Sequence, residues 1–323
     1  MSLGVDEPPS ADSDRPAAIG GSTRFVPGQS HDRVTVVNGK IQLGQRLVDL
    51  WRNRDLLVLL TRTELKIKYK QSVLGYAWSM LNPALVLGIY YVIFKVISKT
   101  TQPHFAIWLF CGLIVWNVFN SSAMASTTVV VGKAGIIKKV AFPRELLALS
   151  TVGVSLVLFV IQLAVLVVFL LLFQLAPDWT ALSLLPLAVL ALVVFTSAVA
   201  VFLSAVTVYL RDTQHLAEVF LMAWFWGTPI VYAFGMIEPH LARWHLTWLY
   251  LANPIAPIAM SFQRAIYGHT SYVFGGVTYP LLPSWGLGGY ACMLAVVLVV
   301  SALLFIGALV VFGRLEGNFA EEL

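Results

Sequence analysis

The sequence predicts an all-α polytopic membrane protein with six transmembrane helices, and three observations lead to this fold class. Of the 323 residues, 59% are hydrophobic and 11% are charged, whereas a soluble domain has roughly 25% charged residues. Residues 1–75 hold 11 Lys or Arg and 8 Asp or Glu, about half of all the charges. Six apolar segments follow, and about 20 apolar residues span a bilayer. These features exclude an ordinary soluble domain.

The first segment, residues 1–43, is expected to be a disordered or loosely structured cytoplasmic tail. It has several prolines and no apolar core of a signal peptide. The net charge of +5 does not indicate a nucleic-acid partner, because the basic residues flank apolar runs and form no basic domain. Cys111 and Cys292 lie in apolar runs, so we expect them to pack in the interior and not to form a disulfide.

Residues 44–75 are predicted to form an amphipathic helix in the cytoplasmic interface of the membrane. Apolar and basic residues interleave here at near-helical spacing, with Trp51 as an aromatic anchor. The basic residues either anchor the chain beside anionic lipid headgroups or form a collar that attracts an anionic lipid substrate. They are Arg52, Arg54, Arg62, Lys66, Lys68 and Lys70.

A transmembrane domain over residues 76–313 comes next, followed by a short cytoplasmic tail over 314–323. The six predicted spans are 75–97, 105–127, 147–173, 182–208, 217–236 and 287–312. With the N-terminus inside, 17 Lys and Arg residues fall on the cytoplasmic side and 4 on the outer side or outer helix ends. The positive-inside rule therefore predicts that both termini are cytoplasmic.

The external connection over 237–286 is largely apolar in its middle but is broken by Pro254 and Pro257. We expect short re-entrant helices before the last span, because a seventh span would place the C-terminus outside. Irregular backbone at that depth needs protein or water around it. The alternative is an interfacial helix on the outer leaflet.

No catalytic residue, metal site or cofactor is predicted in this chain. Val131-Gly132-Lys133-Ala134 lacks the upstream glycine and the hydroxyl residue of a phosphate-binding loop. His240 and His245 are five residues apart, which does not fit a helical metal site. No carboxylate lies deep in a span, as proton-coupled transport would require.

Aromatic residues inside the spans are the strongest candidates for substrate contact. Such side chains either belong to interface belts or line a path on which a glycan slides by stacking. The polar residues of the second span either join helices or face a hydrated channel. The candidates for the channel lining are Tyr90, Trp116, Phe119, Asn117, Asn120, Trp224, Trp226 and Tyr232.

The cytoplasmic loop between the second and third spans is a candidate docking segment for a cytosolic partner. A short basic and apolar segment containing Phe-Pro can form a helix parallel to the membrane, in which Phe142 fills a socket of the partner. The alternative is a simple positive-inside loop. The candidate docking residues are Lys138, Lys139, Phe142, Pro143, Arg144 and Glu145.

Five short motifs in order resemble the membrane subunit of ABC-2 type exporters, and in particular the Wzm-like permeases that export lipid-linked polysaccharides such as O-antigen, teichoic acid or galactan. They are Lys68–Gly75 with Trp78 and Pro83, Ile137–Glu145, Tyr209–His215, Thr228–Tyr232, and Asn253-Pro254 with Phe262 and Arg264. Each motif is weak alone, but the ordered set covers residues 45–315.

The resemblance implies a second copy of this chain and two ATP-binding-cassette subunits, which would hold ATP and Mg²⁺. The segment 47–70 would be a gate helix, residues 136–145 would be a coupling helix, and Arg211 and Asp212 would lie near the same surface. The substrate would be a polyprenyl-pyrophosphate-linked glycan that leaves the cytoplasm across a bacterial plasma membrane. Low use of Lys with an Ala, Val and Leu bias resembles the proteins of a high-GC actinobacterium, and such a source would favour a galactan precursor.

Two other functions remain open at this point. One is an ABC-2 exporter of a drug or simple lipid. The other is an integral-membrane polyprenyl-lipid transferase, which would need an Asp-rich cytosolic loop that the sequence lacks.

Overall fold

A computed structural model describes residues 43–70, 78–97, 99, 102–137, 140, 142–268, 271–274 and 277–322. All of them belong to one compact unit, Lys40–Leu323. The predicted tail, apart from Leu43, lies outside the described residues, as do residues 71–77 and the candidate docking residues Lys138 and Lys139.

Two helices occupy the region predicted as a single amphipathic helix. They are α1 (Leu43–Arg52) and α2 (Arg54–Tyr69), and the chain turns between them at Asn53. Neither helix has a fully buried residue, and apolar side chains such as Trp51 and Leu59 are exposed. Helix α2 packs against α6. Their exposed apolar residues suit a position in the membrane interface better than one in bulk water.

Four of the described helices are long and apolar enough to cross a membrane. They are α4 (Phe105–Gly132), α6 (Glu145–Leu172), α7 (Leu185–Tyr209) extended by the 3-10 turn η3 (Ala181–Leu184), and α12 (Leu287–Leu315). A helix of 28 residues, such as α4, is about 42 Å long, which exceeds the hydrocarbon thickness. Four of the six predicted spans are therefore present as long helices.

The other two predicted spans are shorter. The first corresponds to α3 (Trp78–Tyr91), which continues into the π-helix η2 (Val92–Ile97). The fifth, predicted over 217–236, corresponds to α8 (Thr213–Trp226), a helix of 14 residues, or about 21 Å. A single helix over 217–236 was a wrong prediction, because Gly227 and Pro229 end α8 and proline cannot continue the backbone hydrogen bonds.

Short helices precede the last long helix, in the region where short re-entrant helices were expected. They are α9 (Phe234–Arg243), α10 (Thr247–Leu251) and α11 (Ile255–Ile266). Nearly every residue of α11 is buried, because it packs against α4, α7, η3 and α12. Helix α11 is thus surrounded by protein, whereas much of the chain through α10, including Trp244 and Trp248, is exposed.

The described residues are mostly helical, as predicted, with one two-stranded hairpin that was not predicted. Strand β1 (Ser271–Phe274) pairs antiparallel with β2 (Val277–Pro280), with Ser271 opposite Pro280 and Phe274 opposite Val277. Gly235 at the start of α9 faces the end of β2, where a Cβ would collide with the carbonyl oxygen of Pro280. Only glycine allows this close approach.

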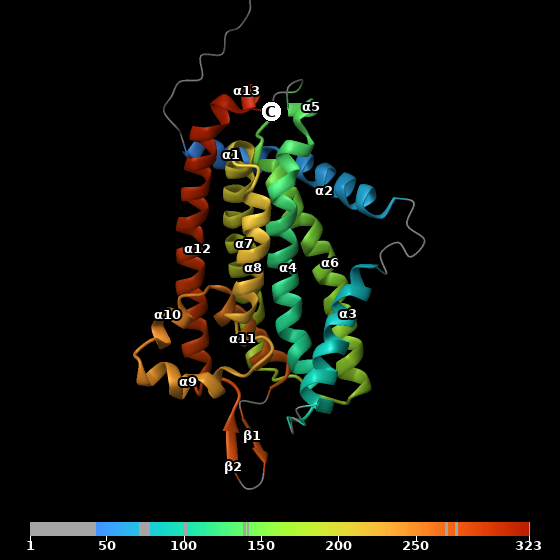
Figure 1. The fold of residues 1–323 in the computed structure, drawn as a ribbon, viewed down its shortest axis with the longest axis vertical. Helices are drawn as coiled ribbons and strands as arrows, with labels where there is room; N and C mark the ends of the chain where they lie inside the picture. The colour runs from blue at the N-terminus through green and yellow to red at the C-terminus, as the bar shows by residue number, and fades with distance from the viewer. Residues whose placement is uncertain are drawn as a thin grey trace, which may run out of the picture. The chain divides into compact units, whose positions relative to one another are not determined.

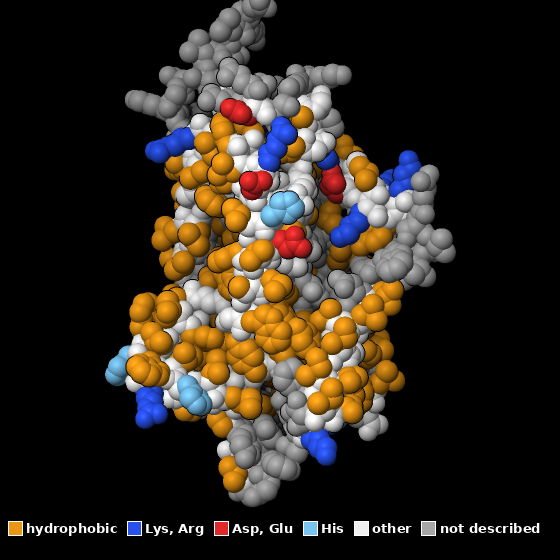
Figure 2. All heavy atoms as spheres, in the orientation of Figure 1, with side chains coloured by type: hydrophobic (Ala, Val, Ile, Leu, Met, Phe, Trp, Pro, Cys, Tyr) orange, Lys and Arg blue, Asp and Glu red, His pale blue; other side chains and the backbone are white. Residues whose placement is uncertain are grey.

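The two ends of the helices differ in their elements (Figure 1). One end, here called the α1 end, has α1, α2, the short helices α5 (Ala134–Ile137) and α13 (Phe319–Glu322), and the 3-10 turn η4 (Glu316–Asn318). The other, here called the hairpin end, has α9, α10 and the two strands. Figure 2 shows mostly apolar side chains between the ends, interrupted on this face by acidic and His side chains in the half nearer the α1 end.

Candidate functional site

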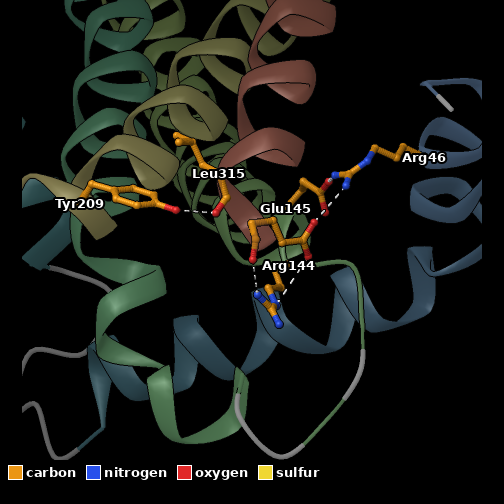
Figure 3. A network of polar contacts seen from close by, with 6 residues as sticks. Arg46, Arg144, Glu145, Tyr209 and Leu315 are labelled. Atoms are coloured by element: carbon orange, nitrogen blue, oxygen red, sulfur yellow. Dashed lines mark hydrogen bonds and ion pairs between the residues drawn. The ribbon is translucent and has the colours of Figure 1, made fainter. Parts of the chain in front are cut away.

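An ion-pair network joins three parts of the chain at the α1 end (Figure 3). The Arg46 guanidinium of α1 pairs with the carboxylate of Glu145, the first residue of α6, and its Nη2 lies 3.1 Å from Oε2 of Glu316. Arg144 Nη1 donates to the backbone oxygen of Glu316 at 3.0 Å. At Gly313 of α12 a Cβ would lie 2.8 Å from Cζ of Arg46. The guanidinium therefore lies directly against the backbone of Gly313, where a Cβ would force it to shift.

Tyr209 continues this network to the end of α7. Its hydroxyl donates to the backbone oxygen of Leu315 at 2.7 Å. Phe319 of α13 packs against both Tyr209 and Phe312, and the Arg144 guanidinium lies 5.9 Å from the centre of its ring. The C-terminal residues are thus held to α6 and α7, on the same end as α1.

A second ion pair joins α2 to the residue after α4. The Lys133 ammonium pairs with the Glu64 carboxylate, and the two side chains are 17% and 24% exposed. Burial lowers the pKa of Lys133, because desolvation disfavours its charged form. The Glu64 carboxylate offsets that cost by direct attraction.

The candidate docking residues fall into two groups in the structure. Arg211 and Asp212 are exposed before α8, while Phe142 and Pro143 are half-buried, and Phe142 packs against the apolar cluster of the α1 end. Glu145 was predicted to face a partner, but its side chain is 3% exposed and paired with Arg46. The sequence pattern showed a charge in a loop but not the internal arginine that it binds.

The basic residues predicted near the interface are all exposed on α1, on α2 or directly after α2. Arg54 lies over the Trp51 ring with its Cζ 5.5 Å from the ring centre. The complete set is Arg52, Arg54, Arg62, Lys66, Lys68 and Lys70. These charges are available to an anionic headgroup or pyrophosphate.

The predicted aromatic residues of three helices meet in one cluster. Tyr90 of α3 stacks on Phe225 at 6.0 Å between ring centres, and Trp226 meets Tyr90 edge-on at 6.2 Å. Trp116 lies 5.3 Å from Phe225. The cluster therefore joins α3, α4 and α8.

Burial separates the members of this cluster by role. Trp226 is 52% exposed, whereas Trp116 is 6% exposed and Phe119 is fully buried. Phe119 packs against Trp224 at 5.1 Å and against Phe195 of α7. The prediction that Trp116 and Phe119 line a channel is wrong for the single chain, since both are core residues that support the exposed rings.

The polar face of α4 forms a seam with α6. Asn117 Nδ2 donates to Gln162 Oε1 at 3.3 Å, and the Ser121 and Ser155 hydroxyls share a hydrogen bond of 2.8 Å. Of the two roles that the sequence left open for this face, the structure gives Asn117 that of joining helices. Asn120 is half-buried.

A hydrogen-bonded group at the hairpin end joins two of the predicted channel residues, Trp224 and Tyr232, to residues that were not predicted as site residues. Trp224 Nε1 donates to Asn253 Oδ1 at 2.9 Å, and Asn253 Nδ2 donates to Thr228 Oγ1 at 2.9 Å. The hydroxyls of Tyr232 and Tyr250 share a hydrogen bond of 3.0 Å. Trp224, Tyr250 and Asn253 border a cavity of about 280 Å³. The Asn253-Pro254 pair was visible in the sequence, but its contact with α8 was not.

One face of α8 was also missed. His215, Glu218, Met222 and Trp226 are spaced i, i+3, i+7 and i+11 and are all exposed, so they share one side of the helix. Ionisable side chains within membrane helices face protein or water. This face therefore does not suit contact with lipid tails, and the spacing alone would have revealed it.

Among the residues that the structure describes, no three His, Cys, Asp or Glu side chains are grouped so as to hold a metal ion. The arrangement contains an aromatic face, an exposed basic set and a network of ion pairs at one end.

The sequence model of the ABC-2 type transporter family matches residues 55–267, which is more than half of the chain. The chain belongs to this family and is a multi-pass membrane component of a transporter. A Klebsiella pneumoniae protein named O-antigen export system permease protein RfbA is 35% identical over 226 residues, covering 70% of this chain and 85% of the relative.

Two further relatives bear the same name. One from Klebsiella pneumoniae is 32% identical over 269 residues, covering 83% of this chain and 95% of the relative. One from Myxococcus xanthus is 32% identical over 225 residues, covering 69% of this chain and 85% of the relative.

Proposed function

We propose that this chain is the permease subunit of an ABC exporter that moves a polysaccharide out of the cytoplasm while the sugar chain is linked to a polyprenyl pyrophosphate. The observation that carries the proposal is the aromatic face formed by the exposed Trp226 and the half-buried Tyr90 over buried rings. Sugars stack on aromatic rings, and a series of shallow contacts lets a long glycan slide. The three relatives named for O-antigen export support this substrate class.

The exposed basic residues of α1 and α2 would attract the pyrophosphate. Each exposed charge contributes little, because water and salt screen it beyond about 8–10 Å. Six exposed cations lie on one short segment, so their summed attraction compensates for the small contribution of each charge. Arg62 and Lys66 are four residues apart on α2 and share one face of the helix, a spacing that suits one anionic group.

Two copies of this chain would enclose the path. The face of α8 with Glu218, Met222 and Trp226 is exposed in the single chain and disfavours lipid. A second copy placed against it would turn this face into the wall of a hydrated path. The exposed apolar residues of α3, including Leu85 and Ile89, flank it.

ATP hydrolysis would belong to two separate subunits with Mg²⁺, docked at the α1 end. The exposed Arg211 and Asp212, and the half-buried Phe142 and Pro143, offer them charged and apolar contacts. In the sequence, 17 of the 21 Lys and Arg residues fall in the segments predicted to be cytoplasmic. By the positive-inside rule, we expect the α1 end to be cytoplasmic. Both termini would then lie on the cytoplasmic side of a bacterial plasma membrane. A cell-wall galactan is our preferred glycan.

The test is to co-express the chain with the ATPase encoded beside it and to purify the complex. We expect two copies of each subunit by mass photometry and an ATPase rate that rises with added polyprenyl-pyrophosphate glycan. A complex stimulated by small amphiphiles and not by the glycan lipid would instead favour an exporter of a drug or simple lipid. Failure of any ATPase to bind would contradict the proposal.

A further inference from the structure

The cytoplasmic connection between α4 and α6 is held by an ion pair at each of its ends. At its start Lys133 pairs with Glu64 of α2, and at its end Glu145 pairs with Arg46 of α1. The chain between them includes α5 and the stretch Phe142–Arg144. The two amphipathic helices are therefore attached to opposite ends of the same connection.

Close backbone contacts back both ion pairs. At Gly153 of α6, a Cβ would lie 2.5 Å from Oγ1 of Thr61, one helical turn before Glu64. At Gly313 of α12, a Cβ would lie 2.8 Å from the Arg46 guanidinium. Helix α2 is thus held closely against α6 through the short Thr61 side chain, whereas the contact of α1 at Gly313 is made by the flexible end of Arg46.

Stability alone gives a weak reason for the Glu64–Lys133 pair. Its side chains are 24% and 17% exposed, and partly solvated ion pairs contribute little to folding. The Lys133 ammonium also donates a charge-assisted hydrogen bond to the Glu64 carboxylate, and such a bond is short and directional, so it can transmit a displacement from one element to another. Glu64 lies between Arg62 and Lys66, two of the exposed cations of α2.

We propose that Glu64–Lys133 and Arg46–Glu145 are positioning contacts that make α2 and α1 follow the α4–α6 connection when an ATPase subunit displaces it. The displacement would carry the exposed cations of α2 with it, so the ATP cycle would move the basic residues that hold the anionic headgroup. This inference rests on the proposed function, since it requires ATPase subunits docked on this connection. It assigns a role to Glu64 and Lys133, neither of which contacts substrate.

The test measures hydrogen exchange of α2, residues 54–69, in the full complex with and without Mg-ATP. In the unaltered complex we expect ATP to change exchange in α2 roughly fivefold, a typical coupling between linked sites. Glu64→Gln and Lys133→Gln should each abolish this change while the complex still hydrolyses ATP. The double exchange Glu64→Lys with Lys133→Glu should restore it, because the pair re-forms with reversed charges.

Asp55→Asn is the matched control, since it makes the same acid-to-amide change on an exposed residue of the same helix. It should behave as the unaltered chain. An ATP-dependent change in α2 that persists in both Glu64→Gln and Lys133→Gln would overturn the inference and leave the proposed function intact. Failure of the unaltered chain to bind an ATPase would overturn both.

Discussion

At the scale of single residues, Trp226 and Phe119 belong to one aromatic cluster but differ in exposure, and this difference separates function from folding. Phe119→Ala should destabilise the protein by about 3–5 kcal/mol, because it leaves a cavity in the core. Trp226→Ala should leave thermal unfolding nearly unchanged, since that ring is 52% exposed, yet should reduce stimulation by the glycan lipid several-fold. Thermal unfolding and ATPase assays on both variants distinguish the two roles. Equal effects on stability would contradict this division.

Asp178 gives a prediction for the pH dependence of stability at the hairpin end. Hydrogen bonds from the Thr180 hydroxyl and the Ala181 backbone amide, together with the Arg264 guanidinium, lower the pKa of Asp178 to about 2. A lowered pKa stabilises the folded state above the unfolded value of about 3.9, and this contribution disappears as the pH falls through the folded value.

Asp178→Asn should therefore lower the melting temperature at neutral pH, and the difference from the unaltered chain should shrink between pH 4 and pH 2. The measurement is a series of melting curves of the two proteins in detergent. Thr180→Val, which removes one of the donors, should give a smaller effect of the same sign. A constant difference across this pH range would contradict the assignment.

Residue chemistry was predictable where it depends on the chain alone. The aromatic and basic side chains could be selected as groups from the sequence, and the structure brings Tyr90, Trp116 and Trp226 together around Phe225. Their exposure was not predictable, because it depends on which neighbours cover each ring. Glu145 shows the same limit, since its partner Arg46 lies 99 positions away in the sequence.

At the scale of elements, the contact between α2 and α6 depends on a single glycine. Gly153→Ala should push α2 away, because the new Cβ would lie 2.5 Å from Oγ1 and 3.0 Å from Cγ2 of Thr61. Overpacking of this kind costs about 1–3 kcal/mol. Melting curves should show the loss, and the added change Thr61→Ala should recover part of it by removing both clashing atoms.

Gly307→Ala on α12 is the matched control, since a Cβ added there would have open space within 4 Å. It should be neutral or slightly stabilising, because alanine favours helix. A Gly153→Ala variant as stable as this control would show that α2 does not seat on α6.

Hydropathy predicted the four long helices because a lipid solvent imposes one strong rule on length and polarity. It failed for the predicted span 217–236, where Gly227 and Pro229 interrupt an otherwise apolar run. The hairpin of β1 and β2 was missed because the strands have only four residues each. Such short pairs depend on contacts such as that of Gly235 with Pro280, which no local pattern records.

At the scale of the whole molecule, the ion pairs of Arg46, Lys133 and Arg144 lie at the α1 end, while the Asp178–Arg264 pair and the hydrogen-bonded aromatic group lie toward the hairpin end. A transporter needs this separation, because energy enters at one side of the membrane and the substrate leaves at the other. Helix α8 links the two, with Asp212 at its start and Trp226 at its end. The order of segments in the sequence predicted which of them share an end of the molecule, but not the contacts that connect the two ends.

The most direct measurement is of glycan export in cells from which this chain is depleted. We expect surface glycan, labelled on intact cells, to fall while its polyprenyl-pyrophosphate precursor accumulates inside the plasma membrane. Restoring the chain should reverse both changes, and restoring Trp226→Ala should do so only partly. Unchanged surface glycan without any accumulation of the precursor would contradict the account.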